Sequence, residues 1–472
     1  MRQNNLVSLS HPKLFRTNPK YFNFDNFKQL ENELIKLKID EDDKGEIFEI
    51  FIEAFLKTTK LFNVKKIFAS QKNFPNYIFD KLGIPRTDKG IDGIIIDINN
   101  KIIPYQVKFR SSKKLDYDEL TGFKDQSVRA EEKILFTNAN LIGEEYFKRG
   151  NNIAFRGVDF EKLTTLEMSK INSIFHKKSF KTLEEKKIDK YQEDAINSIE
   201  KELKTQDRTT CLMACGTGKT YVALWYIERV QAKKIIVFVP SIALLKQIRG
   251  DWLSNSKIKN LTSFAVCSDK SEPRSFDEIK LKKKDLNFKI DTDPKEIRKF
   301  INNNDDSTKI IFTTYHSSEA VKKACKNITF DIGIFDEAHR TTSFSIKNQE
   351  TAFNLGLLDK NILIKKRVFF TATQKVFNHK IVDKFGNPKI KFNMNNPSIY
   401  GNVCYKLNFY NAHKLNAISD YKIIITETDN SELSEELRKR SITKIKKNRI
   451  INDQIAHQVS IKKAIDKHNL SK

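Results

Sequence analysis

A glycine-rich segment that follows an apolar run constrains this 472-residue chain more than any other feature. The segment reads Met213-Ala-Cys-Gly-Thr-Gly-Lys-Thr220, and a helix-forming stretch follows it. Gly216 and Gly218 allow main-chain N–H groups to approach a phosphate, and the start of the helix adds the positive end of its dipole. The order of strand, glycine loop and helix therefore predicts an α/β fold with a phosphate-binding loop.

The remainder of this half repeats the alternation of apolar strands and amphipathic helices. Helices are expected from Thr220 and from Ala243. Apolar runs predict buried strands at Cys211–Ala214, Lys234–Pro240, Ile310–Tyr315, Ile332–Asp336 and Arg367–Thr371. Such a rhythm predicts a parallel, doubly wound α/β sheet.

Two segments of this sheet carry the residue types that nucleotide hydrolysis requires. In the glycine loop, Lys219 is expected to contact the β- and γ-phosphates of ATP, and the Thr220 hydroxyl to bind Mg²⁺. In Asp336-Glu-Ala-His339, Asp336 is expected to hold Mg²⁺ and Glu337 to polarise the attacking water. Either motif alone could be a solvated loop. Their order, each at the end of an apolar strand, leaves that alternative little room.

Three further segments make the sequence resemble superfamily 2 helicases of the DEAD/DEAH type. Tyr191-Gln192 resembles the family's adenine-recognition element, and Thr371-Ala-Thr373 resembles the element that couples hydrolysis to movement. Val239–Ala243 and Thr313–Ser317 resemble its strand-tracking elements. The resemblance implies a nucleotide site made by Tyr191, Gln192, Gly216, Thr217, Gly218, Lys219, Thr220 and Asp336.

These added segments also have a plainer interpretation. Thr371 and Thr373 could simply end a buried strand, and Ser241 and Thr314 could be ordinary loop hydroxyls. Their order relative to the two ATP motifs favours the helicase interpretation.

The N-terminal part of the chain contains a different pattern. Apolar residues recur at helical spacing in Lys44–Leu61, which predicts an amphipathic helix. Two strands are expected at Ile91–Ile98 and Ile102–Phe109, with a tight turn at Asn99-Asn100. A further strand is expected at Lys133–Asn138, and Ile153–Phe160 leads into a last helix.

Gly90-Ile-Asp92-Gly93 followed by Tyr105-Gln106-Val-Lys108 resembles the PD-(D/E)xK nucleases, particularly their Mrr-like branch. The resemblance implies that Asp92 and Gln106 place Mg²⁺ beside the scissile phosphate, with Lys108 near the attacking water. Glu49 is the candidate carboxylate on the helix. The alternative is that Asp92 and Lys108 are surface residues of an ordinary hairpin.

The hairpin register decides whether these side chains can meet. A strict two-residue turn would pair Asp92 with Val107 and leave Gln106 and Lys108 on the other face of the sheet. One extra residue, in a longer turn or at a bulge near Pro104, restores a common face.

The expected organisation follows from these segments. An N-terminal extension (1–40) precedes a restriction-endonuclease-like α/β domain (41–170), a charged linker (171–188) and a RecA-like ATP-binding domain (189–400). Residues 401–472 are expected to begin a second RecA-like domain that is incomplete, because no late helicase motif follows Tyr421. Arg438, Arg440 and Arg449 are interpreted as helix-surface charge. We therefore expect a fragment, a truncated product, or a chain completed by a further chain.

Composition limits the partners. Lys and Arg number 85 against 60 Asp and Glu, and the pI is near 9.5, which favours a polyanion such as nucleic acid. The five cysteines lack paired spacing, which disfavours a disulfide framework or a zinc site. No run of about 18 apolar residues occurs, so we expect a soluble intracellular protein without a membrane partner. We expect the cytoplasm, with a nuclear location and a virus-encoded origin left open as alternatives.

The combination resembles restriction-type helicases, including type ISP restriction-modification enzymes. That resemblance implies an ATP-dependent DNA translocase coupled to a metal-dependent endonuclease, with ATP and Mg²⁺ as cofactors, duplex DNA as the substrate, and possible pairing with a methyltransferase. Two alternatives stay open. The first is a non-catalytic remnant that binds DNA and ATP, and the second is an RNA helicase that shares the ATP motifs.

Overall fold

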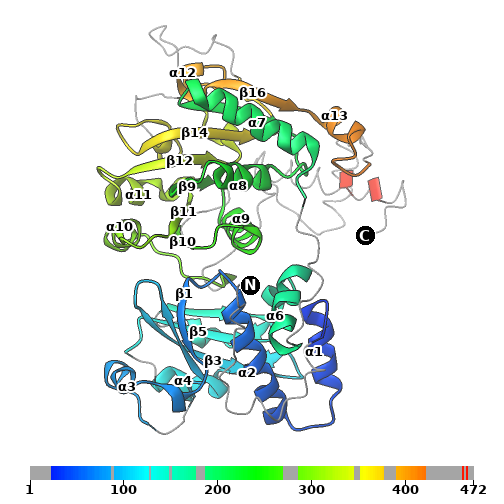
Figure 1. Cartoon of the computed structure of the whole chain (residues 1–472), viewed down its shortest axis with the longest axis vertical. Coiled ribbons are helices and arrows are strands. Elements are labelled where there is room, and N and C mark those ends of the chain that lie inside the picture. Colours follow the sequence, from blue (N-terminus) through cyan, green and yellow to red (C-terminus); the bar gives the residue numbers. More distant parts are fainter. Residues whose placement is uncertain are drawn as a thin grey trace, which may run out of the picture. The chain divides into compact units, whose positions relative to one another are not determined.

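The computed structural model describes residues 23–86, 90–126, 129–147, 151–176, 187–268, 285–344, 351–376, 390–420, 460–461 and 464–465 (Figure 1). The chain divides into two compact units, residues 1–409 and 410–472. Both large sheets belong to the first unit. Most of the expected linker and most of the segment after Tyr421, with the three arginines expected on a helix surface, lie outside the described residues.

The N-terminal sheet has five strands in the order β1-β2-β3-β5-β7. The first two pairings are antiparallel, and β3 pairs in parallel with β5, as β5 does with β7. The strands are β1 (Val64–Phe68), β2 (Gly93–Asp97), β3 (Ile102–Lys108), β5 (Glu132–Thr137) and β7 (Asn151–Phe155). This mixed sheet supports the candidate nuclease residues.

Helix α2 (Glu41–Thr58) covers one face of this sheet. Its start is fixed by Asp40, whose side chain accepts a hydrogen bond from the N–H of Asp43, and by acidic residues in its first turn. Helices α1 (Phe27–Lys36) and α6 (Thr165–His176) share this core. The opposite face is covered by α3 (Asn76–Leu82) and α4 (Thr121–Gln126).

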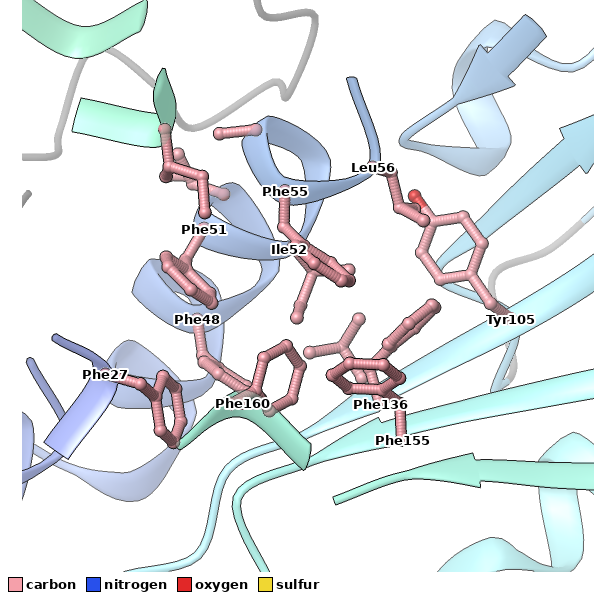
Figure 2. Close-up of a cluster of buried hydrophobic side chains, with 14 of the residues drawn as sticks. Phe27, Phe48, Phe51, Ile52, Phe55, Leu56, Tyr105, Phe136, Phe155 and Phe160 are labelled. Atoms are coloured by element: carbon pink, nitrogen blue, oxygen red, sulfur yellow. The ribbon is translucent and has the colours of Figure 1, made fainter. Parts of the chain in front are cut away.

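The core under α2 is built largely from phenylalanine rings (Figure 2). Phe160, in the short helix α5 (Gly157–Phe160), lies at its centre. The Phe160 ring centroid is 4.6 Å from that of Phe155, 4.8 Å from that of Phe27 and 5.5 Å from that of Phe55. Aromatic pairs at such separations are stabilising beyond the area that they bury. This cluster fixes the helix against the sheet.

The hairpin between β2 and β3 differs from the expected two-residue turn. Gly93 lies opposite Tyr105, and the loop comprises residues 98–100. Asn100 takes a left-handed conformation (φ 59°), and its N–H donates to the carbonyl of Asp97 at 3.0 Å. A three-residue loop that ends in a left-handed residue is a common hairpin geometry. The two-residue turn is therefore wrong, and the longer turn that was the alternative is present. Asp92 immediately precedes β2, and its N–H donates to the carbonyl of Tyr105 at 3.0 Å. Pro104 forms no bulge, because it pairs with Ile94.

The second sheet has seven parallel strands in the order β10-β11-β9-β12-β14-β8-β16. The expected parallel α/β fold class is thus confirmed. The strands are β8 (Arg208–Met213), β9 (Lys234–Val239), β10 (Leu261–Val266), β11 (Thr308–Thr314), β12 (Thr329–Phe335), β14 (Leu363–Thr371) and β16 (Asn402–Leu407).

Helices cover both faces of this sheet (Figure 1). On one face Trp252 of α9 packs against Phe312, and α8 contacts both α7 and α9. On the other face α10 and α11 pack on Ile311 and its neighbours. The helices are α7 (Lys190–Thr205), α8 (Lys219–Arg229), α9 (Ile242–Asn255), α10 (Pro294–Asn302) and α11 (Ser318–Ala324).

Strand β16 completes the parallel sheet at its edge. It pairs with β8, from Asn402 opposite Thr209 to Leu407 opposite Met213. Gly401 precedes it with φ 68°, and a Cβ atom there would lie 2.1 Å from the carbonyl oxygen of Arg208. Residues 402–407 thus lie in the sheet of the ATP-binding domain, whereas a new domain was expected from residue 401.

Smaller elements complete the described structure. They are β4 (Lys114–Leu115) paired with β6 (Leu141–Ile142), β13 (Ser343–Phe344) paired with β15 (Ile390–Phe392), α12 (Pro397–Tyr400) and α13 (Phe409–Lys414). Within the described residues, no helix combines the length and the apolar character needed to cross a membrane.

The aromatic core yields a stability prediction. Phe55 is 1% exposed, so Phe55→Ala removes a buried ring and leaves a cavity. We expect it to lower the free energy of unfolding of the N-terminal domain by about 3–5 kcal/mol. Chemical denaturation followed by circular dichroism measures this loss. Tyr77→Ala, on the exposed face of α3 (51% exposed), is the control, and equal midpoints for the two variants would contradict the packing described.

Candidate active sites

The strand order of the seven-stranded sheet gathers the expected ATP residues. Strands β11, β9, β12, β14 and β8 are neighbours in that order, and all are parallel. Their carboxyl ends therefore lie along one edge, where α/β sheets usually bind ligands. This edge carries five of the predicted elements. They are the tracking segment (Thr313–Ser317) at the end of β11, Ser241 after β9, Asp336 after β12, Thr371 at the end of β14 and the glycine loop after β8.

The glycine loop has the conformation that its sequence requires. Gly216 and Gly218 have φ values of 84° and 80°, in the left-handed region that favours glycine. The hydroxyl of the fully buried Thr217 donates to the carbonyl of Ala214 at 2.7 Å. The ammonium of Lys219 lies 3.2 Å from the carbonyl oxygen of Met213 at the end of β8. The lysine is thus held over the loop, where a polyphosphate would meet it.

Gln192, one of the two predicted adenine-recognition residues, lies next to this loop. The side chain of Gln192 accepts a hydrogen bond from the N–H of Asp189 and donates one to the carbonyl of Thr217 at 3.2 Å. A Cβ atom on Gly218 would lie 2.5 Å from the Gln192 amide nitrogen, so the glycine also makes room for this contact. Tyr191 is half-buried, and burial together with Asp189 raises its pKa to about 12. Both residues belong to the first turn of α7.

Asp336 and Glu337 follow β12 directly. The N–H of Asp336 donates to the carbonyl of Phe238 at 2.9 Å, which ties the end of β12 to β9. Glu337 takes a left-handed conformation (φ 47°, ψ 48°), which is uncommon for a residue with a side chain. Backbone strain of this kind is concentrated at functional sites. Here it turns the glutamate away from the strand direction.

His339 joins Glu337 to the predicted coupling element. Its Nδ1 lies 3.3 Å from a carboxylate oxygen of Glu337 and 2.9 Å from the hydroxyl oxygen of Thr371. The Thr371 hydroxyl donates to the carbonyl of Thr373, so its oxygen is an acceptor toward the histidine. One Nδ1–H group therefore serves both partners. Sequence reasoning assigned no role to His339, although its place in the Asp336–His339 motif was visible.

The electrostatics of this pair separate the two acidic side chains. Burial, and then the charge of Glu337, raise the pKa of Asp336 to about 6. The hydrogen bond with His339 lowers the pKa of Glu337. Glu337 is consequently ionised near neutral pH, as a residue that orients water must be, and Asp336 gains from a cation that compensates its charge.

The tracking-element hydroxyls have local partners. Ser241 caps α9 by accepting a hydrogen bond from the N–H of Leu244. Thr314 is fully buried and donates to the hydroxyl of Ser317 at 3.1 Å. These hydroxyls therefore stabilise the segments that carry them, while Tyr315, which sequence reasoning passed over, reaches the carbonyl of Asp336.

In the N-terminal domain, Asp92 lies next to the strand that carries Gln106, because the N–H of Asp92 donates to the carbonyl of Tyr105 at 3.0 Å. A carboxylate oxygen of Asp92 accepts a hydrogen bond from the N–H of Val107 at 2.6 Å. Gln106 is 3% exposed, and its Oε1 atom has no hydrogen-bond partner among the described residues. An unsatisfied buried carbonyl is costly unless a ligand completes it. Lys108, two residues further along β3, is half-buried.

Helix α2 contributes two acidic residues one turn apart. Glu49, the predicted carboxylate, is half-buried, whereas Glu53 is fully buried and pairs with Lys57 at 2.7 Å. Burial and the charges of Glu53, Asp92 and Glu49, in that order, hold the pKa of Tyr105 well above its usual range. Tyr105 therefore lies among all three carboxylates, and its hydroxyl end lies beside α2 in Figure 2.

Gly93 makes this arrangement possible. A Cβ atom on Gly93 would lie 2.1 Å from the Cζ atom of Tyr105. Sequence reasoning missed Glu53 and Tyr105, since only the folded helix and hairpin bring them together.

The donor set fits a divalent cation in part. Among the described residues, no three acidic, histidine or cysteine side chains group as a metal site. The unsatisfied Oε1 of Gln106 is nevertheless a suitable neutral oxygen ligand. A hard cation here would rest on Asp92, Gln106 and Glu49, and would be held less tightly than at a site with three carboxylates.

Known proteins resemble both halves of this chain. The family model described as "Type III restriction enzyme, res subunit" matches residues 185–376. Two proteins curated as probable helicases, from two isolates of African swine fever virus, are 24% identical over 233 residues, which is 49% of this chain and 23% of theirs. Residues 185–376 thus form a helicase-type domain.

The structure described as "ATP-dependent Type ISP restriction-modification enzyme LlaBIII bound to DNA" has a similar fold. Its TM-score with this chain is 0.65 at 21% sequence identity, and the match covers 88% of this chain and 27% of that one. The chain therefore spans about a quarter of the length of these relatives. The mixed α/β architecture with a parallel RecA-like sheet is shared with the type ISP enzyme.

The two ends of β12 carry aspartates whose pKa values shift in opposite directions. Burial acts to raise the pKa of Asp331, but hydrogen bonds from Lys365 and from the N–H groups of Lys233 and Lys234 outweigh it and lower the pKa. Asp331 therefore stabilises the fold above pH 4 or so, and this contribution is lost as the pH falls. Asp336, with its raised pKa, destabilises the metal-free fold fully above pH 6 and not at all well below 4.

We expect Asp336→Asn to stabilise the protein in EDTA at pH 7.5 by about 1–3 kcal/mol, because burial and the charge of Glu337 make the ionised carboxyl of Asp336 unfavourable in the folded protein. Asp331→Asn should destabilise it by about 1 kcal/mol at the same pH. The difference for Asp336→Asn should disappear as the pH falls from 6 to below 4, whereas the difference for Asp331→Asn should shrink only below about pH 4. Thermal unfolding across this pH range measures them, and a destabilising Asp336→Asn would contradict the electrostatics described.

Proposed function

We propose that this chain is the motor and nuclease portion of a restriction-type enzyme, an ATP-dependent DNA translocase coupled to a metal-dependent endonuclease. The observation that carries the motor half is the convergence of Lys219, Asp336, Glu337 and Thr371 on one edge of a parallel sheet. The match of residues 185–376 to the restriction-enzyme family supports it.

The residues of the motor site divide the work of ATP hydrolysis. Lys219 and the N–H groups of the glycine loop bind the phosphates, and Tyr191 and Gln192 would recognise the adenine. Thr220 and Asp336 would hold Mg²⁺, which neutralises charge on the β- and γ-phosphates. Glu337, kept ionised by His339, orients a water for attack on the γ-phosphorus and accepts its proton.

Thr371 and Thr373 connect this site to movement. Because His339 contacts both Glu337 and Thr371, a shift of the glutamate on hydrolysis reaches the loop after β14 through one side chain. Thr371 and Thr373 are the coupling residues in this proposal. Full motor activity of this kind needs a second RecA-like domain, which we propose is supplied beyond the described residues or by another chain.

The nuclease half rests on a smaller set of observations. Asp92, Gln106 and Glu49 would hold Mg²⁺, which activates water and stabilises charge on the scissile phosphate. Lys108, on the same strand as Gln106, would stabilise the developing charge. The unsatisfied oxygen of Gln106 supports this assignment, and the small number of carboxylates predicts a requirement for high metal concentration.

DNA is the proposed substrate. The chain carries a formal charge of +25, and its structural relative is described as bound to DNA. Phosphate contacts would supply most of the affinity, so binding should weaken steeply as salt rises. A nuclease-like domain beside the motor favours DNA over RNA.

The alternative of a non-catalytic remnant keeps one specific observation in its favour. The described residues hold no group of three acidic, histidine or cysteine side chains around Asp92, so the fold could persist without cleavage. The two experiments below separate the alternatives for each half of the chain.

For the motor, we expect Lys219→Ala to weaken binding of ATP with Mg²⁺ by at least about tenfold, because the loop loses its phosphate contact. Equilibrium titration with a fluorescent ATP analogue measures binding, and phosphate release with duplex DNA measures turnover. Lys204→Ala, on the exposed side of α7, should match the wild type. A wild-type chain that binds no nucleotide would refute the motor assignment.

For the nuclease, we expect the wild type to nick plasmid DNA with Mg²⁺ and Asp92→Asn to reduce the rate by about 100-fold or more. The exposed aspartate of α3 provides the matched control, Asp80→Asn, which should cleave normally. Gel analysis of plasmid forms is the measurement. DNA binding without any cleavage by the wild type, across Mg²⁺ and Mn²⁺ concentrations, would establish the remnant interpretation of this domain.

A further inference from the structure

A buried tyrosine connects the tracking segment to the ATP site. Tyr315 is the first residue after β11 and lies within the segment Thr313–Ser317. It is 1% exposed, and its hydroxyl donates to the main-chain carbonyl of Asp336 at 2.8 Å. Segments on two strands that are not neighbours, β11 and β12, are thereby joined by one hydrogen bond.

The tyrosine ring has a fixed position. It stacks between Phe353, at a centroid distance of 5.4 Å, and Phe238, at 6.0 Å, with an interplanar angle of 16° in each case. Phe238 stacks in turn on Phe335 at 4.5 Å. A Cβ atom on Gly356 would lie 2.7 Å from the Phe238 ring, so a larger residue there would disturb the stack. The hydroxyl is therefore aimed by packing.

The carbonyl that accepts this bond has a particular importance. The C=O of Asp336 and the N–H of Glu337 belong to one planar peptide group, so fixing the carbonyl fixes the plane on the N-terminal side of Glu337, which is one of the two planes that define its backbone conformation. Glu337 has φ 47° there, a conformation that a residue with a side chain keeps only when its surroundings impose it. The N–H of Arg340, which donates to the carbonyl of Glu337 at 2.9 Å, holds the next peptide group.

The tracking segment is itself a rigid unit. The hydroxyl of Thr314 donates to that of Ser317, and the hydroxyl of Ser318 donates to the carbonyl of Tyr315 at 2.9 Å. A displacement of this segment moves the Tyr315 ring with it, and the ring acts directly on the peptide group between Asp336 and Glu337.

We propose that Tyr315 is a positioning residue for ATP hydrolysis, which sets the peptide plane between Asp336 and Glu337 and makes that plane respond to the DNA-tracking segment. The inference rests on the proposed motor function. Tyr315 is not one of the phosphate-binding, metal-binding or water-orienting residues. In this inference, its side chain couples DNA contact to the geometry of hydrolysis.

The test compares Tyr315→Phe with the wild-type chain. The variant keeps the stacked ring and loses only the hydroxyl. We expect its affinity for ATP in EDTA to stay within about twofold, because the glycine loop is untouched, while the strengthening of ATP binding by Mg²⁺ falls about three- to tenfold. Where the wild type turns over ATP, kcat should fall about 10- to 100-fold with KM little changed, and stimulation by duplex DNA should fall most.

Tyr146→Phe is the matched control. Tyr146 is fully buried, and its hydroxyl also donates to a main-chain carbonyl, that of Ile153 at 3.2 Å, but it lies in the N-terminal domain. A role limited to stability would lower the unfolding temperature in both variants and leave the Mg²⁺ effect unchanged in both.

The outcomes separate the inference from the proposal beneath it. A wild type that binds no ATP overturns the motor assignment and this inference together. In a second outcome, the wild type binds ATP more tightly with Mg²⁺, and Tyr315→Phe shows the same strengthening and the same stimulation by DNA. That outcome overturns the role of Tyr315 alone. Loss of the Mg²⁺ effect in Tyr315→Phe with retention in Tyr146→Phe supports it.

Discussion

The parallel pairing of β12 between β9 and β14 is the constraint on which the ATP site depends. Because neighbouring parallel strands end at the same edge, Asp336, Glu337 and Thr371 meet without any long loop to carry them. The start of β12 stabilises the fold, whereas the end of β12 is energetically unfavourable. Asp331 accepts hydrogen bonds from three donors at its start, whereas its end carries a carboxylate with a raised pKa and a left-handed glutamate. The hydrogen bonds at Asp331 therefore offset the unfavourable charge and backbone conformation at the proposed site.

The N-terminal domain follows the same physical logic with different means. A phenylalanine core fixes α2 against the sheet, and the acidic side of the helix is thereby directed to the hairpin that carries Asp92 and Gln106. Asp92 accepts a hydrogen bond from the N–H of Val107, whereas the described residues offer no partner to the Oε1 atom of Gln106. A bound cation would satisfy this oxygen, and in the motor half it would compensate the charge of Asp336, whose pKa is raised.

Much of the motor fold could be predicted from the sequence, because buried parallel strands are continuous apolar runs with short, recognisable loops. The strands at Lys234–Val239 and Thr329–Phe335 lie within a few residues of their predicted positions. Strands β10 and β16 escaped prediction. The first contains Thr262 and Ser263, and the second lies at a sheet edge with alternating polar residues, so neither has the apolar signal of a central strand.

The sites were less predictable than the fold. Lys219 and Asp336 could each be named from the spacing within its own motif. The contacts of Tyr315, His339 and Tyr105, in contrast, depend on strands and helices that are distant in sequence. The hairpin turn was predicted with two residues, because Asn99-Asn100 is a good turn sequence, but Asp97 and Lys101 close a three-residue loop around it. Turn length follows from the competition of both strands for partners, which no local pattern reveals.

That hairpin loop has an evolutionary consequence. The side chains on a strand alternate between the two faces of the sheet, so the length of the loop, and not the composition of either strand, decides which residues of β3 lie opposite β2. A single-residue insertion or deletion at residues 98–100 would shift this register and turn the residues of one strand to the other face, while preserving every residue of the motif. Proteins that descend from such a change would keep a recognisable nuclease motif, but their hairpin would no longer hold the motif residues in place. Within such lineages, loop length would be a better guide to retained chemistry than the motif itself.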